Sequence, residues 1–157
     1  MAKERNANPK AGVSEEASGL TILLADDEAG IRDLVGQVLR SYGYKVLEAA
    51  DGVEALEVAE QHPGPIHLLL TDWCMPRLDG GGLIRSLSNG RPETAVIVMS
   101  GSINVESPPK AGVLRKPFNS QDLVDSVHGV LNGQWLSREA QSGSEIVHAV
   151  NSRSAVV

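Results

Sequence analysis

The chain has 157 residues and a formal net charge of −6, which favours a single domain with tails and argues against unaided nucleic-acid binding. Hydrophobic content is ordinary for a globular core, but aromatics make up only 3%, so aliphatic side chains must build that core. The single cysteine excludes an intrachain disulfide framework, and no apolar segment has the length of a membrane span or the pattern of a signal peptide. We therefore expect a cytoplasmic protein with no membrane or nucleic-acid partner.

The predicted elements alternate along the chain. Apolar runs predict strands at about 21–25, 45–48, 66–72, 95–99 and 112–115, with a helical pattern after each of the first three and the last. Asp51 and Asn119 are expected to cap two helices, and the helix after the third strand is expected to follow a loop that runs to Gly82. Alternating strands and helices imply a parallel sheet with right-handed crossovers.

The two ends of the chain differ from this central region. Residues 1–18 are polar and poor in apolar side chains, which predicts a disordered tail. Residues 134–157 are too few for an output domain. We expect one domain over 19–133 between these two tails.

Acidic residues follow the first predicted strand directly. Asp26 and Asp27 come after the run 22–25, and the carboxyl ends of parallel strands are where such sheets place ligand sites. Two adjacent carboxylates repel each other unless a cation neutralises them, and oxygen ligands suit Mg²⁺. A solvated turn that caps the next helix would explain the pair equally well.

Polar residues at the ends of three later strands favour the cation site. Asp72 ends the third predicted strand, Ser100 ends the fourth, and Lys116 follows the fifth. If all are parallel strands of one sheet, three carboxylates, a hydroxyl and an ammonium group converge on one edge.

This set of motifs resembles the receiver domain of two-component response regulators. The matching segments are Asp26-Asp27-Glu28, Thr71-Asp72 with Met75-Pro76, Ser100-Gly101, and Lys116-Pro117-Phe118. The local sequence is most similar to that of receivers attached to hybrid histidine kinases. The resemblance covers about 20–132 and implies an α/β, flavodoxin-like, doubly wound sheet of five parallel strands in the order 2-1-3-4-5.

The resemblance also implies a role for each site residue. Asp72 would accept a phosphoryl group, with Ser100 and Lys116 contacting it. Mg²⁺ would be held by Asp27, Asp72 and the backbone carbonyl of Cys74, and by Asp26 mostly through bound water. Lys116 would contact Asp72 at rest, aimed by a cis bond to Pro117.

The same resemblance implies the partners. A sensor histidine kinase or a histidine phosphotransfer protein would donate the phosphoryl group, and the phosphorylated domain would signal through changed contacts with an unknown downstream protein, with a homodimer as one arrangement. The domain would not be an enzyme beyond its own phosphorylation and dephosphorylation.

Three features depart from the family pattern. The segment 101–110 is short and contains Pro108-Pro109, so we expect the fourth helix to be shortened or missing. Val113 stands where the family commonly has a switch aromatic. Cys74 orients water poorly at a position that tunes acyl-phosphate lifetime, which predicts slow self-dephosphorylation.

Other functions fit the sequence less well. A receiver-like scaffold that never uses phosphate is favoured slightly by the short segment and Val113. A Mg²⁺-dependent phosphohydrolase with an aspartyl-phosphate intermediate would need an aspartate where Cys74 stands. A flavodoxin-like flavin binder would need a phosphate loop where Asp26, Asp27 and Glu28 would repel the ligand.

Overall fold

The structure is a computed structural model that describes residues 19–102 and 111–133. The expectations for the tails at 1–18 and 134–157 lie outside these residues, and so does most of the segment in which a reduced fourth helix was expected. No helix within the described ranges is long and apolar enough to cross a membrane.

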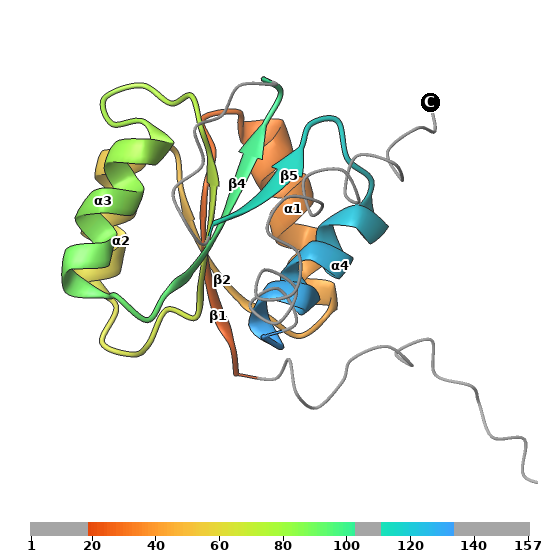
Figure 1. The fold of residues 1–157 in the computed structure, drawn as a ribbon, viewed down its shortest axis with the longest axis horizontal. Helices are drawn as coiled ribbons and strands as arrows, with labels where there is room; N and C mark the ends of the chain where they lie inside the picture. The colour runs from red at the N-terminus through yellow and green to blue at the C-terminus, as the bar shows by residue number, and fades with distance from the viewer. Residues whose placement is uncertain (1–18, 103–110, 134–157) are drawn as a thin grey trace, which may run out of the picture.

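A five-stranded parallel sheet forms the centre of the fold (Figure 1). Its strands are β1 (Thr21–Ala25), β2 (Lys45–Ala49), β3 (Leu68–Asp72), β4 (Ala95–Ser100) and β5 (Gly112–Arg115). They lie in the order β2-β1-β3-β4-β5, which confirms the expected topology. The buried runs that predicted these strands are continuous because helices cover both faces of the sheet.

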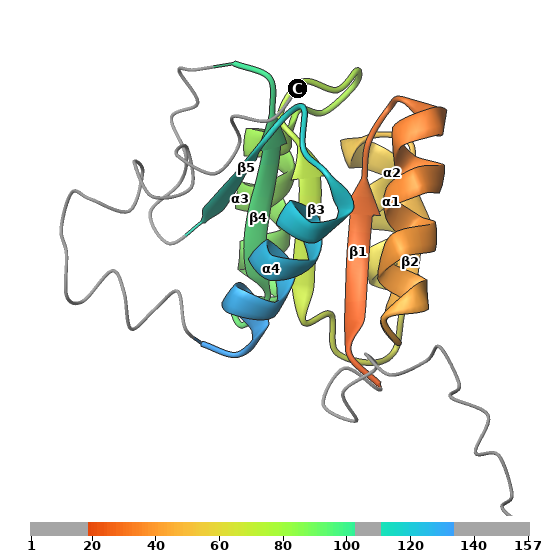
Figure 2. The ribbon, with the colours of Figure 1, turned by 90° about the vertical axis from the view of Figure 1, so that its right-hand side faces the viewer.

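Within the described residues, helices cover both faces of the sheet (Figure 2). The helices are α1 (Ala29–Ser41), α2 (Gly52–Gln61), α3 (Gly80–Gly90) and α4 (Ser120–Leu131), with α1 and α4 on one face and α2 and α3 on the other. The predicted caps are confirmed: the Asp51 side chain accepts a hydrogen bond from the Glu54 amide, and Asn119 forms a capping box with Asp122.

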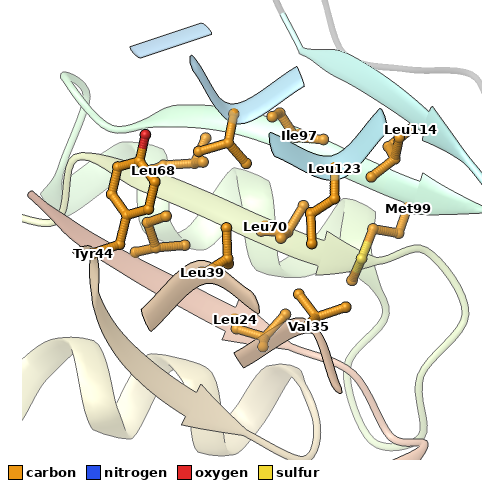
Figure 3. Packing of buried hydrophobic residues seen from close by; sticks show 12 residues of the cluster. Leu24, Val35, Leu39, Tyr44, Leu68, Leu70, Ile97, Met99, Leu114 and Leu123 are labelled. Carbon is orange, nitrogen blue, oxygen red and sulfur yellow. The ribbon is translucent and has the colours of Figure 1, made fainter. Parts of the chain in front are cut away.

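The core consists of two aliphatic clusters, one on each face of the sheet. Figure 3 shows the larger, in which Leu24, Leu70 and Met99 of the central strands pack against Val35 and Leu39 of α1. These side chains are at most 1% exposed. The core therefore holds the central strands β1 and β3 firmly where β3 ends in Asp72 and where Asp26 follows β1.

Two predicted boundaries were wrong. The third strand begins at Leu68 and not at Ile66. The amide of Thr21 donates to Nδ1 of the His67 ring, and the paired register of β1 and β3 starts at Ile22 and Leu68. Helix α3 begins at Gly80, although a loop was expected to run to Gly82.

The early start of α3 has a packing reason. Asp79 caps the helix by accepting a hydrogen bond from the Gly82 amide at 2.7 Å. A Cβ on Gly80 would lie 2.5 Å from the carbonyl oxygen of Asp72, so only glycine allows the first turn to approach the end of β3 this closely. The glycines serve close packing here and do not mark a loop.

Candidate functional site

The sheet brings the polar strand ends to one edge, the upper edge in Figure 1. Strand pairing sets Asp72 opposite Met99, and Ser100 opposite Arg115, so the ends of β3, β4 and β5 lie at one level. Asp26 and Asp27 follow the neighbouring β1. Parallel register alone therefore gathers residues that are far apart in sequence.

Three carboxylates form the centre of the site. Oxygen atoms of Asp26, Asp27 and Asp72 all lie within 4.8 Å of one another. Asp26 is fully buried, Asp72 is 8% exposed, and Asp27 is exposed to solvent. An exposed carboxylate beside two buried ones gives a hard cation an oxygen-lined approach from solvent, so the donor set fits Mg²⁺.

Lys116 is the cation that the chain itself supplies to this cluster. Its Nζ lies 3.0 Å from Oδ2 of Asp26 and 3.5 Å from Oδ1 of Asp72, and the Lys116–Pro117 peptide bond is cis, as the resemblance implied. The expected resting contact with Asp72 is thus the longer of the two. Asp26 is the nearer partner because its carboxylate is fully buried and needs a charged donor.

Burial and nearby charges shift the pKa values of the Asp72 carboxyl and the Lys116 ammonium group. Burial raises the pKa of the Asp72 carboxyl and the charge of Asp26 raises it further, while Lys116 and the amide of Trp73 oppose them. Burial disfavours the Lys116 ammonium, but its hydrogen bond to Asp26 and the charges of both aspartates outweigh burial and raise its pKa. The site therefore keeps the lysine charged beside a carboxylate that is short of neutralising charge.

Backbone contacts fix Asp26 in place. Its Oδ1 accepts a hydrogen bond from the amide of Glu28 at 2.9 Å, and its carbonyl oxygen accepts one from the Arg32 guanidinium at 2.7 Å. The role of Arg32 was not predicted, since nothing in a basic residue on an amphipathic helix indicates which carbonyl it reaches.

Ser100 and Val113 lie where the sequence placed them. Ser100 is buried at the end of β4, and its Oγ accepts a hydrogen bond from the amide of Ser102 at 3.1 Å. Val113 is half-buried on β5, opposite Val98 of β4. The hydroxyl is thus held at the edge that carries the carboxylates, and an aliphatic side chain stands at the expected switch position.

The loop after Asp72 borders the site on its outer side. The Trp73 amide donates to Oδ1 of Asp72 at 2.9 Å, and Lys116 approaches the same oxygen, so neither contact engages Oδ2. Cys74 is exposed. Further along the loop, Arg77 forms an ion pair with Asp51 that sequence reasoning did not anticipate.

Comparison with known families identifies the family of the chain. The model of the response regulator receiver domain matches residues 22–128. The chain belongs to this family. The receiver resemblance drawn from the four motifs is therefore confirmed, and so is the place of the chain among two-component signalling domains.

Similar proteins include both kinase-attached and separate receivers. Sensor kinase CckA of Brucella abortus is 36% identical over 139 residues, which cover 85% of this chain and 14% of the kinase. Response regulator receiver protein CpdR of the same organism is 34% identical over 116 residues, which cover 70% of this chain and 95% of CpdR. The chain thus spans a small part of the first relative and nearly all of the second.

Solved receiver structures share the fold. The receiver domain of the hybrid histidine kinase CckA has a TM-score of 0.64 and 36% identity, covering 71% of this chain and 98% of that domain. CheY4 of Vibrio cholerae has a TM-score of 0.64 at 28% identity, with the same coverage. The flavodoxin-like receiver fold is therefore confirmed.

Proposed function

We propose that this receiver accepts a phosphoryl group on Asp72 from a histidine kinase or a histidine phosphotransfer protein. The observation that carries the proposal is the grouping of Asp26, Asp27 and Asp72 within 4.8 Å, with Lys116 3.5 Å from Asp72. A helix cap or a structural turn would need neither three carboxylates nor a half-buried lysine at one strand edge.

Transfer of the phosphoryl group from a phosphohistidine to Asp72 needs no further reactant. A carboxylate oxygen of Asp72 forms a bond to phosphorus as the phosphorus–nitrogen bond of a phosphohistidine breaks, and the imidazole nitrogen keeps the bonding electrons. Such transfer depends on in-line positioning and on neutralising charge at the equatorial oxygens. Oδ2 is the oxygen that the Trp73 and Lys116 contacts do not engage, which favours it as the nucleophile.

The chain's own groups would share the charge of the incoming phosphoryl group. Lys116 lies within reach of an oxygen of a phosphoryl group on Asp72. The Ser100 oxygen accepts a hydrogen bond from the Ser102 amide, and the hydroxyl proton can still be donated to the phosphoryl group. Mg²⁺, when bound by Asp26, Asp27, Asp72 and the Cys74 carbonyl, would neutralise further negative charge.

Signalling follows from the same chemistry. We infer that the functional unit is 19–133, that it acts as a single-domain response regulator, and that phosphorylation changes its contacts with a downstream protein. Lys116 would exchange aspartate for phosphoryl oxygen, which changes the charge at the ends of β4 and β5. Self-phosphorylation from small donors and self-dephosphorylation would be its only reactions.

One observation favours a second function, that of a scaffold that does not use phosphate. Val113 is half-buried on β5 and offers no aromatic ring to report the state of the site. In a scaffold the acidic cluster would be retained for its shape and charge alone, and phosphorylation would change no partner contact.

The deciding experiment is intact mass spectrometry after incubation with Mg²⁺ and acetyl phosphate or phosphoramidate. We expect one added phosphoryl group in the natural chain and none in Asp72→Asn. Adduct formation that is unchanged in Asp72→Asn would refute the assignment of Asp72. No adduct from these donors or from a cognate-type phosphohistidine protein would favour the scaffold.

A further inference from the structure

The loop between β3 and α3 is tied to the start of α2 by a charged pair. Nε of Arg77 donates to Oδ2 of Asp51 at 2.8 Å, and a second guanidinium nitrogen lies 2.6 Å from the same oxygen. Oδ1 of Asp51 meanwhile accepts from the Glu54 amide at 2.9 Å. Asp51 therefore caps α2 with one oxygen and holds the loop with the other.

The loop backbone is strained where this pair holds it. Arg77 has φ of 64°, and the Leu78 amide donates to the Pro76 carbonyl oxygen at 2.7 Å, which together describe a γ-turn centred on Arg77. The γ-turn with positive φ is rare and strained for residues other than glycine. Arginine gains nothing from this backbone conformation, so its side-chain contact is what suits it to the position.

Close packing and a hydrogen bond connect the part of the loop around Arg77 to the phosphoacceptor Asp72. A Cβ on Gly52 would clash with the carbonyl oxygen of Leu78, so this part of the loop lies directly on the first turn of α2. At the other end, the Gly80 amide donates to the Trp73 carbonyl oxygen at 2.9 Å, which closes the loop immediately after Asp72. Residues 73–76 thus lie between two fixed points, the contact of Leu78 with α2 and the hydrogen bond from Gly80 to Trp73.

We propose that Asp51 and Arg77 are positioning residues that hold the loop 73–79 so that the Mg²⁺ ligands around Asp72 are pre-organised. The inference rests on the proposed function, since it assigns these residues to the same cation site. Neither residue contacts the cluster directly. Their effect is carried by the backbone that bears the Cys74 carbonyl and the Trp73 amide, and the latter bonds to Asp72.

A merely structural role makes a different prediction. An ion pair that only fastened α2 to the loop would alter the free energy of unfolding and leave cation affinity unchanged. A positioning role lowers cation affinity even where the fold is no less stable. Arg77→Gly separates the two, because it removes the ion pair and at the same time relieves the positive φ.

The test is a Mg²⁺ titration followed by Trp73 fluorescence in a Trp135→Phe background. Supporting contacts around metal ligands change affinity by roughly 10–100-fold, and for a pair outside the ligand shell we expect about tenfold weaker binding in Arg77→Gln and Arg77→Gly. Asp51→Asn keeps an acceptor for the helix cap and should weaken Mg²⁺ similarly. The double variant Asp51→Asn/Arg77→Gln should be no weaker than either single variant, as expected for one coupled pair.

Arg40→Gln is the matched control. Arg40 also pairs with an acidic residue, Glu48 at 2.7 Å, and its loss changes the net charge by the same amount. Its Mg²⁺ affinity should stay within about twofold of the natural chain, since a pair between α1 and β2 reaches the site only through screened charge. An equal loss of affinity in Arg40→Gln would show that the loss of an ion pair elsewhere in the fold weakens the site just as much, and would overturn the proposal.

Amide hydrogen exchange without Mg²⁺ gives a second readout. Exchange at 73–79 should quicken in Arg77→Gln and Asp51→Asn while the strands keep their protection. Unchanged exchange together with unchanged Mg²⁺ affinity would overturn the inference and leave the proposed function standing. No Mg²⁺ response in the natural chain would overturn both, whatever the variants show.

Discussion

Replacing Asp72 with asparagine should stabilise the fold in the absence of metal. The carboxylate oxygens lie within 4.8 Å of one another, and at this upper limit and an effective dielectric constant of about 20, each repulsion of Asp72 by Asp26 or Asp27 costs roughly 3.5 kcal/mol. The attraction to Lys116 at 3.5 Å returns roughly 4.7 kcal/mol. The two repulsions exceed the attraction by about 2 kcal/mol, and solvent screening of the exposed Asp27 lowers the expected gain to about 1–2 kcal/mol.

The pH dependence of this gain has a definite sign. The pKa of Asp72 is raised by burial, so the folded state binds the proton more tightly than the unfolded state does. The natural chain is therefore penalised once the pH is above the raised pKa, and the penalty fades as the pH falls through that pKa to the ordinary carboxyl range. The advantage of Asp72→Asn should be full above the raised pKa and vanish in acid.

Urea unfolding followed by circular dichroism, with a chelator present, measures the effect. We expect Asp72→Asn to unfold at a higher urea concentration. In a thermal unfolding experiment its melting temperature should be higher by about 5 °C. Adding Mg²⁺ should narrow the difference, because the ion binds the natural site more tightly and stabilises it by mass action. Equal or lower stability of Asp72→Asn at pH 7 without metal would refute the electrostatic reasoning.

Three further predictions follow from other contacts. Lys116→Met should lower the free energy of unfolding by about 3 kcal/mol, since it leaves the fully buried Asp26 without its cationic partner. Asn119→Ala should cost about 1 kcal/mol through loss of the capping box with Asp122, as measured by urea unfolding. Burial raises the pKa of Tyr44 to about 12, so its phenol absorbance should titrate near that pH and disappear in Tyr44→Phe.

Each of these has a contrary outcome. A Lys116→Met variant as stable as the natural chain would show that the fold does not depend on the ion pair between Lys116 and Asp26. Gln121→Ala serves as the control for Asn119→Ala, because it removes an exposed side-chain hydrogen bond to Asp125 from the same helix turn without touching the cap. An equal loss of stability in both would show that the capping box has no special weight. A Tyr44 phenol that titrates in the ordinary range would contradict its burial.

The strand ends explain why so much of the site was predictable. The five site residues lie at or just after the end of a predicted strand, and parallel strands place such positions at one edge whatever the details of packing: Asp26, Asp27, Asp72, Ser100 and Lys116. The caps at Asp51 and Asn119 were predictable because their hydrogen bonds span three residues.

The contacts that escaped prediction depend on loop geometry. Arg77 reaches Asp51 across 26 residues, and Arg32 reaches the carbonyl of Asp26, because the folded backbone happens to set donor and acceptor side by side. The early start of α3 likewise depends on how closely Gly80 approaches the end of β3. No periodicity or motif encodes such distances.

The sequence by itself determined the sheet, the family and the residues gathered at its edge, because hydrophobic period and strand polarity are local properties. Only the tertiary structure decided which aspartate Lys116 prefers and how the loop after Asp72 is fastened. Lys116 lies nearer Asp26 because that carboxylate is fully buried, and burial is a property of the packed core that no stretch of the chain carries alone.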